Sequence, residues 1–298
     1  MIKGLIVTNA YSHSKQVEYK ISRFREEFLK YDVVLEVKDT IELGFSLEKN
    51  NFTFKDINSY SFAIYLDKDP YIAFALEKIM PLFNSATSIH LCDDKMLTYL
   101  NLTDIGVKIP YTVPSPLCYF PSPDEKKINM FLDIVESKIS YPLVIKECYG
   151  SLGRQVYLIK NRDELYAKYK ELIRIPHMYQ EFIKTSIGKD FRIFVVDGKV
   201  VAYMLRKNDV DFRSNIALGG KGYLVKPDDK YLELASKIAS KLGLTYCGID
   251  LMIGEDDIPY LAEVNSNAFF TEIEKISKVN VTKLVVEAIA KKLNLKAK

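Results

Sequence analysis

The chain has 298 residues, of which 48% are hydrophobic and 27% are charged, and its net charge is +3. This composition is typical of a globular protein of two or three domains and excludes an intrinsically disordered chain. Lysines and arginines are interspersed with acidic residues, so no basic patch predicts nucleic-acid binding. Apolar runs such as Phe62 to Leu66 are far shorter than the roughly 20 residues of a membrane span, and we therefore expect a cytoplasmic protein without a membrane partner.

The first 88 residues alternate predicted strands with predicted helices. Apolar β-rich runs and helical spacing give, in chain order, a strand from Ile2 to Thr8, a helix from Gln16 to Lys30, strands from Val33 to Val37 and from Phe62 to Asp67, and a helix that Pro70 opens. In this last helix Ala73, Leu76 and Ile79 are expected to pack inward. Such alternation predicts a small parallel sheet covered by helices.

The remaining residues predict two further parts. Residues 89–177 contain a helix that carries Leu97 and Leu100 on one side and ends at Gly106, a helix around Ile128 to Ser137, and two strands, PLVIKEC and VYLIK, joined by a glycine-containing loop. Residues 178–298 contain the strand MYQEFI, a hairpin that turns at Asp197 and Gly198, a helix from Leu232 to Leu242, the strands YCGIDLMIG and PYLAEVNSN, and a final helix from Val281 to Leu293. The sequence thus predicts an α/β protein of three domains, 1–88, 89–177 and 178–298, the last built on an antiparallel sheet.

Three oxygen-bearing side chains lie on two predicted neighbouring strands. Glu263 and Asn265 are two residues apart on one strand and so point to the same face, and Asp250 lies on the preceding strand. Hard oxygen ligands without His or Cys are those that Mg²⁺ prefers, with phosphate oxygens and water completing its octahedron. Each residue alone would be interpreted as a polar residue at a sheet edge. The three together predict a magnesium site.

Two lysines are candidate ligands for an anion. Lys146 lies inside the apolar strand PLVIKEC, where an ammonium group is costly unless it meets an anion. The loop after it contains Gly150, Ser151 and Gly153, whose backbone N–H groups could close over phosphates, although short glycine turns between strands are also common. Lys95, at the start of a predicted helix, fits equally well as a solvated lysine near the N-cap.

A third group of candidates combines arginines with other polar residues. Its members are Asp190 and Arg192 in GKDFRIF, Arg206 in MLRK, and Arg213 with Asn215 in DFRSN. Arginine suits two-pronged contact with carboxylate or phosphoryl oxygens. An ordinary surface ion pair is the alternative for each arginine. Residues 219–222, GGKG, are typical of a mobile loop near the same site.

In this order the motifs resemble the ATP-grasp superfamily, and specifically the RimK-type glutamate ligases, from about Leu91 to Val281. DDKMLTYL is similar to the family's first nucleotide-binding lysine segment, YPLVIKECYGSLGRQVYLI to its second lysine and phosphate loop, and QEFI to its adenine hinge. GKDFRIFVVDGKVVAYMLRK, DFRSNIALGGKG, CGIDLM and LAEVNSN follow in the family's order. The resemblance implies an ATP-grasp fold, in which an N-terminal pre-ATP-grasp domain precedes two subdomains that hold ATP between them.

The resemblance also implies a role for each candidate residue. It assigns adenine to residues 181–183, ribose to Asp190, and ATP binding as a whole to Lys95, Lys146, Gly150, Ser151, Gly153, Glu181, Phe182, Ile183, Asp190, Arg192 and Ser214. It assigns Mg²⁺, as two ions for which Mn²⁺ can substitute, to Asp250, Glu263 and Asn265. It places Arg206, Arg213 and Asn215 at the reacting phosphate.

The implied function is ATP- and Mg²⁺-dependent ligation of a carboxylic acid to an amine through an acyl phosphate. By analogy with the family the amine is an amino acid such as glutamate, and the acid belongs to a metabolite, a peptide or a protein. A non-catalytic ATP-binding protein and an ATP-dependent carboxylase are the alternatives. Where relatives often have Ser-Pro-Gly, this chain has SNAFF at residues 266–270. The sequence therefore leaves the substrates open, as it does the formation of a homo-oligomer.

Overall fold

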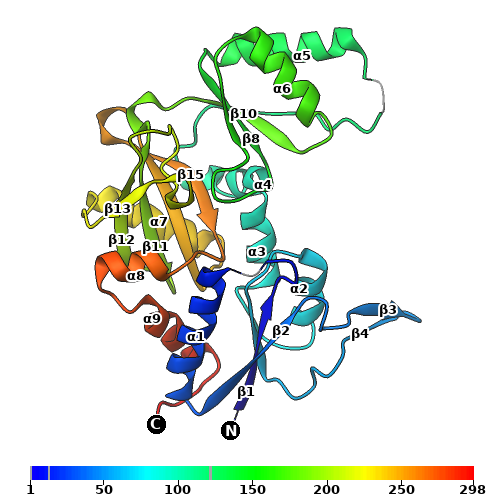
Figure 1. Cartoon of the computed structure of the whole chain (residues 1–298), viewed down its shortest axis with the longest axis vertical. Helices are drawn as coiled ribbons and strands as arrows, with labels where there is room; N and C mark the ends of the chain where they lie inside the picture. Colours follow the sequence, from blue (N-terminus) through cyan, green and yellow to red (C-terminus); the bar gives the residue numbers. More distant parts are fainter. Residues whose placement is uncertain (1, 13, 121–122) are drawn as a thin grey trace.

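The computed structural model describes residues 2–12, 14–120 and 123–298. Its three main sheets follow one another along the long axis of the molecule (Figure 1). The N-terminal sheet and both chain termini lie at one end, the middle sheet lies at the other, and the C-terminal sheet lies between them. One parallel and two antiparallel sheets, each covered by helices, confirm the predicted α/β fold.

A four-stranded parallel sheet in the order β2-β1-β5-β6 forms the N-terminal part, as predicted. It contains β1 (Ile2–Thr8), β2 (Val33–Asp39), β5 (Phe62–Tyr65) and β6 (Leu82–Phe83), with the helices α1 (Lys15–Leu29) and α2 (Pro70–Glu77). A short hairpin of β3 (Ser46–Glu48) and β4 (Asn51–Thr53), which the sequence does not predict, projects from it (Figure 1). The inward packing expected of Ile79 is wrong, because α2 ends at Glu77 and the Ile79 side chain is 48% exposed.

The helix predicted to run to Gly106 is instead a series of three short helices. They are α3 (Ala86–Asp93), α4 (Lys95–Leu100) and the 3-10 helix η1 (Thr103–Ile105). Asp94 has an extended backbone between the first two, and its side chain caps α4 by accepting hydrogen bonds from two backbone N–H groups. Tyr99 is buried and Leu100 is exposed, so the buried side of α4 is not the one that Leu97 and Leu100 mark.

A four-stranded antiparallel sheet in the order β7-β10-β8-β9 forms the middle part. Its strands are β7 (Thr112–Pro114), β8 (Leu143–Glu147), β9 (Val156–Ile159) and β10 (His177–Glu181), and α5 (Glu125–Lys138) and α6 (Arg162–Leu172) pack on it over an apolar core. The predicted boundary between residues 177 and 178 falls inside β10, which pairs with both β7 and β8. We therefore propose that the middle domain extends to Glu181.

A five-stranded antiparallel sheet in the order β13-β12-β11-β14-β15 forms the C-terminal part. Its strands are β11 (Lys189–Val196), β12 (Lys199–Lys207), β13 (Lys221–Tyr223), β14 (Tyr246–Ile253) and β15 (Pro259–Asn265), and its helices are α7 (Asp229–Lys241), α8 (Thr271–Ser277) and α9 (Val281–Lys292). The β11–β12 hairpin turns at Asp197 and Gly198, both with positive φ, as predicted. Within the described ranges, the helices are all too short or too polar to span a membrane.

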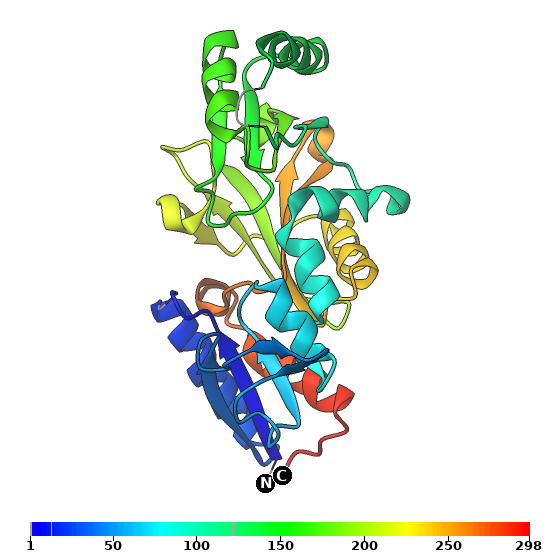
Figure 2. The same ribbon diagram turned by 90° about the vertical axis from the view of Figure 1, so that its right-hand side faces the viewer.

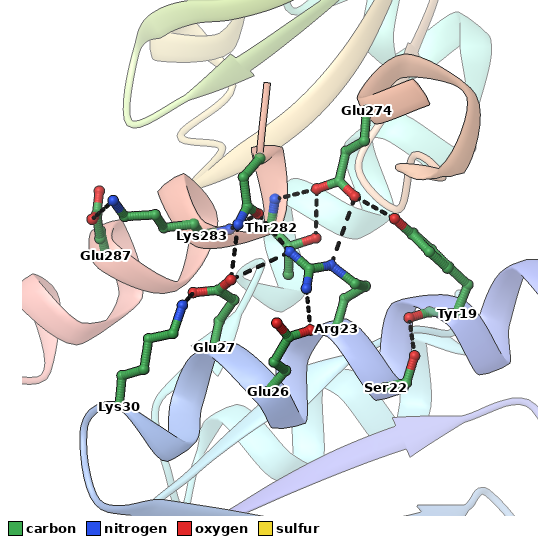
Figure 3. A network of polar contacts seen from close by, with 11 residues as sticks. Tyr19, Ser22, Arg23, Glu26, Glu27, Lys30, Glu274, Thr282, Lys283 and Glu287 are labelled. Carbon is green, nitrogen blue, oxygen red and sulfur yellow. Dashed lines mark hydrogen bonds and ion pairs between the residues drawn. The ribbon is translucent and has the colours of Figure 1, made fainter. Parts of the chain in front are cut away.

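Helix α1 of the N-terminal part packs against α8 and α9, which come from the other end of the sequence. Figure 3 shows the polar contacts between them. Arg23 donates a hydrogen bond to Asn280 at 2.8 Å and lies 3.9 Å from Glu274. Glu27 accepts a hydrogen bond from Asn280 at 2.8 Å, and the Tyr19 hydroxyl donates to Glu274 at 2.6 Å. These contacts fix the C-terminal sheet to the N-terminal part.

One lysine of α1, Lys20, is completely buried at this contact. Its ammonium group donates hydrogen bonds to Asn267 Oδ1 at 2.6 Å and to the Ala268 carbonyl at 3.1 Å. Burial lowers the pKa of Lys20 to about 7. The folded protein therefore gives up this proton at a lower pH than the unfolded chain does.

This difference predicts a pH-dependent stability. Between about pH 7 and the ordinary lysine pKa of about 10.4, the unfolded chain binds a proton that folded Lys20 does not, so stability rises with pH in this window. The Lys20→Met variant lacks this contribution. We therefore expect the free energy of unfolding of the wild type to rise, relative to that of Lys20→Met, between about pH 7 and pH 9 in urea titrations. Parallel curves for the two proteins would contradict the lowered pKa.

Candidate active site

A cleft between the middle and C-terminal sheets collects most of the predicted site residues. Its empty space, including the open mouth, is about 900 Å³. Every candidate from the sequence lines it except Arg192 and Asn265. The candidate residues of the middle part lie on β8, in the loop after β8, and at or just after the end of β10. The other candidates lie on α4, β11, β12, β14 and β15 and in the loop at residues 212–215.

Two lysines and the glycine loop form one end of the cleft. Lys95 is buried, with 7% of its surface exposed, so its interpretation as a solvated lysine is wrong. Its ammonium group donates a hydrogen bond to the Gly150 carbonyl at 3.1 Å and lies 3.5 Å from Glu263 Oε1. Burial, with a smaller contribution from the positive charge of Lys95, lowers the pKa of Lys146 to about 8. Two cations that face the same space form a site suited to an anion.

Loops from the two parts of the protein meet beside this end of the cleft. Arg213 donates a hydrogen bond from Nη1 to the Gly153 carbonyl at 2.7 Å, and its Nη2 lies 2.6 Å from Asp211. Gly153 has a φ of +74°, and a methyl group on it would lie 2.5 Å from Asn215 Oδ1. Both the backbone conformation and the contact therefore require glycine. Arg213 does form an ion pair with Asp211, as the alternative interpretation expected. It also contacts Gly153 across the cleft, which an ordinary surface ion pair would not do.

The end of the cleft away from the loop at Gly150 is apolar, since Val144 lies opposite Gln180, two residues before Lys146 on β8. Further apolar residues that line the cleft are Pro110, Phe182, Ile183 and Met252. The Phe182 ring meets the Phe212 ring edge to face, with 6.0 Å between their centres. An apolar slot of this kind suits a flat aromatic ligand.

Gln180, beside this apolar end, has an unusual surrounding. It is buried, and its Nε2 donates a hydrogen bond to Thr112 Oγ1 at 2.8 Å. Its Oε1 has no hydrogen-bond partner among the described residues. Because an unpartnered buried acceptor is costly, this oxygen is suited to a donor on a ligand. Gln180 is the first residue of the motif QEFI, which resembles the adenine hinge, but that resemblance assigned adenine only to residues 181–183.

Four buried or partly buried charged side chains form a ladder on the C-terminal sheet, which we call the charge ladder (Asp190, Arg206, Asp250 and Arg192), and all of them except Arg192 line the cleft. Asp190 faces Arg206 across β11 and β12, and Arg192 faces Asp250 across β11 and β14. Arg206 donates to both carboxylate oxygens of Asp190, at 2.7 and 2.5 Å, and its Nη2 also lies 2.8 Å from Asp250. Arg192 donates to both carboxylate oxygens of Asp250. The surface-ion-pair alternative is therefore wrong for Arg206, which is only 4% exposed.

The charge ladder determines the charge state of Asp250. Burial alone would raise the pKa of its carboxyl group, but the guanidinium groups of Arg192 and Arg206 hold that pKa below its usual value. Asp250 therefore stays ionised. The opposite charges of Asp190 and Asp250 likewise outweigh burial and raise the pKa of Arg206. The ladder thus pairs two carboxylates with two guanidinium groups.

The three predicted metal ligands lie together, with different surroundings. β14 and β15 are antiparallel neighbours, as predicted, with Asp250 opposite Glu263 and Gly248 opposite Asn265. The buried Nδ2 of Asn265 has no hydrogen-bond partner in the part of the chain that the structure describes. Within that part, no three His, Cys, Asp or Glu side chains cluster as a metal site. A cation here would therefore depend on Asn265 and on phosphate oxygens in addition to the two carboxylates, a donor set of hard oxygens that fits Mg²⁺.

Comparison with known proteins gives consistent matches. A family model of the RimK-like ATP-grasp domain matches residues 97–289. N-acetylaspartylglutamate synthase A of Homo sapiens is 31% identical over 229 residues, which cover 76% of this chain and 56% of that protein. The alpha-aminoadipate–LysW ligase LysX of Saccharolobus solfataricus is 29% identical over 229 residues, which cover 73% of this chain and 78% of that one. The chain thus spans little more than half the length of the human relative.

Solved structures support the fold. A D-alanine–D-alanine ligase from Bacillus anthracis, complexed with ATP, superposes with a TM-score of 0.71 at 16% sequence identity. The match covers 98% of this chain and 97% of that chain. At this level of identity, the likeness concerns the fold alone.

The lowered pKa of Lys146 predicts that nucleotide affinity falls in alkaline solution. Phosphate binds the protonated ammonium, and above about pH 8 the free protein loses this proton, so binding becomes weaker as pH rises. Lys146→Met should bind an ATP analogue more weakly at neutral pH and should lose this pH dependence. Calorimetric titration at several pH values measures both effects. Lys160→Met, at an exposed position after β9, is the control and should behave as wild type.

The alternation of β15 predicts opposite effects for two adjacent residues. Val264 is 1% exposed, on the opposite face from Glu263. Glu263→Gln should preserve the melting temperature and abolish Mg²⁺-dependent nucleotide turnover. Val264→Ala should lower the free energy of unfolding by about 1 to 3 kcal/mol and leave the metal dependence intact. If Glu263→Gln retains activity, the cation site lies elsewhere.

Proposed function

Because the RimK-like ATP-grasp model matches residues 97–289, this chain belongs to the RimK-like ATP-grasp family, and we propose that it is an ATP- and Mg²⁺-dependent carboxylate–amine ligase. The observation that carries the proposal is the cleft. It places two lysines, a glycine loop and paired carboxylates at one end and an apolar slot at the other. A nucleoside triphosphate requires both, because its phosphates are anionic and its base is flat and largely apolar.

ATP fits this cleft in one direction. Its adenine ring would occupy the apolar slot beside residues 181–183, where the free Oε1 of Gln180 could accept a hydrogen bond from the exocyclic amino group. Its phosphates would meet Lys95, Lys146 and the loop of Gly150, Ser151 and Gly153. The ribose would lie between the adenine slot and the phosphates, near Asp190 and Ser214. The carboxylate of Asp190, however, already accepts hydrogen bonds from Arg206. We therefore propose that Asp190 acts mainly by holding Arg206.

Mg²⁺ would be held by Asp250, Glu263 and Asn265, and we propose two ions. When bound, the metal would neutralise phosphate charge and orient the phosphates for transfer. Glu263 lies beside Lys95, and Asp250 lies beside two arginines, so each carboxylate has cationic neighbours. Arg192 does not line the cleft, and we propose that its role is to hold Asp250 ionised rather than to bind nucleotide.

The proposed reaction has two steps. A carboxylate oxygen of the acid attacks the γ-phosphorus, the bond to the β-phosphate oxygen breaks, and ADP leaves. The amine nitrogen then attacks the acyl carbon, inorganic phosphate leaves, and the nitrogen loses a proton. Arg206, Arg213 and Asn215 lie in the cleft lining and would stabilise the transferring phosphoryl group. Positioning and charge neutralisation would carry this chemistry, because no nucleophilic side chain takes part.

The substrates are proposed by class. The two relatives are named as a synthase and a ligase that act on amino acids or their derivatives, and we propose an amino acid such as glutamate as the amine. The acid is proposed to be a metabolite, a peptide or a protein side chain or terminus. The SNAFF segment at residues 266–270 follows the proposed metal ligands and is the part of the chain most suited to distinguish these acids.

A screen of ADP formation tests the proposed function. We expect ADP release that requires Mg²⁺ together with both an acid and an amine, across panels of amino acids, small carboxylic acids and peptides. ADP release with bicarbonate alone would instead indicate a carboxylase. Nucleotide binding without ADP release under any condition would indicate a non-catalytic ATP-binding protein. An ATP analogue with Mg²⁺ should in addition raise the melting temperature, because it binds only the folded state.

A further inference from the structure

Two side chains of the N-terminal part hold the segment that follows β15. Asn84, after β6, donates a hydrogen bond to the Ser266 carbonyl at 2.8 Å. Lys20, on α1, donates to Asn267 Oδ1 at 2.6 Å and to the Ala268 carbonyl at 3.1 Å. The conformation of the segment is therefore set partly by residues from a distant part of the chain.

Asn84 and Lys20 differ in the free energy that their burial costs. Asn84 is a neutral amide, and it also bonds the backbone of β14 at Tyr246 through Nδ2 at 2.8 Å. Lys20 brings an amine into the interior with no carboxylate to pair with it among the described residues, and burial lowers its pKa to about 7. The closest ring centres to its ammonium are those of Phe270 at 4.7 Å and Tyr246 at 5.5 Å. Two hydrogen bonds and aromatic faces offset only part of the cost of burying an ammonium group.

An apolar side chain of the same length would fill this space at lower cost. The contribution of Lys20 is therefore better explained by geometry than by stability. Its two acceptors lie on consecutive residues, one on a side chain and one on the backbone. Holding both at once fixes the direction of the chain at Asn267 and Ala268.

This segment is joined to the proposed site in two ways. It directly follows Asn265, so its first residues lie next to the proposed metal ligands along the chain. It also packs under the charge ladder, since a methyl group at Gly248 would lie 2.8 Å from the Ala268 Cβ and 3.2 Å from the Arg192 Cδ. Ser266, Ala268 and Phe270 are buried, whereas Asn267 and Phe269 are partly exposed. Neither of these two residues is among those that line the cleft, and Asn267 and Phe269 are the two side chains of the segment that keep some exposed surface beside it.

We propose that Lys20 is a positioning residue, which holds residues 266–268 so that Asn267 and Phe269 form a wall of the active site where the acid meets the transferring phosphate. The proposed wall lies next to Glu263 and Asn265, which would hold the metal on the phosphates. The acid must approach the phosphates from the side of these two residues that the segment borders. The part of the inference that concerns substrate rests on the proposed function. The part that concerns the position of residues 266–268 does not.

Three variants of the full chain test the inference. Lys20→Met retains the length of the side chain and removes both hydrogen bonds. Asn267→Ala keeps the lysine and removes its side-chain acceptor. Lys15→Met, at an exposed position on the same helix, is the matched control and should behave as wild type in every measurement. If Lys20→Met does not fold, Asn267→Ala decides by the same criteria.

Amide hydrogen exchange is the first measurement. We expect exchange at residues 266–270 to be about tenfold faster in Lys20→Met and in Asn267→Ala, with β14 and β15 unchanged. The melting temperature of Lys20→Met should equal or exceed that of the wild type. Unchanged exchange in both variants would overturn the proposal. Faster exchange throughout β14 and β15 together with a lower melting temperature would also overturn it, because Lys20 would then be merely structural.

Steady-state kinetics form the second measurement. In both variants we expect the KM for the acid to rise about tenfold while the affinity for an ATP analogue stays within about twofold of wild type. An equal loss for acid and nucleotide would overturn the proposed effect on the acid. If the wild type forms no ADP with any acid, the proposed function has failed, and hydrogen exchange with nucleotide affinity still decides whether Lys20 positions the segment.

Discussion

The charge ladder on the C-terminal sheet is the interaction on which the rest of the site depends. Each of its four charges would be costly to bury alone, by several kcal/mol after relaxation. Two-pronged contacts between arginine and carboxylate offset this cost, and they require Asp190, Arg206, Asp250 and Arg192 to lie on one face of β12, β11 and β14. The ladder therefore fixes the register of three strands and the ionised state of Asp250 together.

Because the charge ladder is neutral as a whole, the positive character of the cleft comes from residues outside it. Lys146 lies on a strand of the middle sheet, and Lys95 lies on the helix that leads from the N-terminal part. Glu263 balances part of this charge from β15. Groups that would repel one another without a ligand thus converge from separate parts of the fold, and an anion with its metal is the natural complement of that arrangement.

The N-terminal part contributes to the site without lining the cleft. Arg23 and Glu27 attach α1 to α8 and α9, and Lys20 and Asn84 hold the segment after β15. Figure 2 shows the same arrangement from the side, with α1 and the last helices together at one end. Residues of α1, α8, α9 and the segment after β15 also share one apolar core. A change in the N-terminal part can therefore reach the proposed metal ligands through the segment at residues 266–270.

Local pattern in the sequence was enough to predict most strands and helices and the antiparallel pairing of β14 with β15. These features follow from periodicity and from the chemistry of single residues. Of the residues that gather in the cleft, Lys95, Ser214 and residues 181–183 were predicted only through the family resemblance. What pairs with each charge was decided by tertiary structure alone. The sequence could not show that Asp250 faces two arginines, because strand register sets that contact. It could have shown Lys20, four residues before Phe24 on one stripe of α1, but not its acceptors, since they come from the opposite end of the chain.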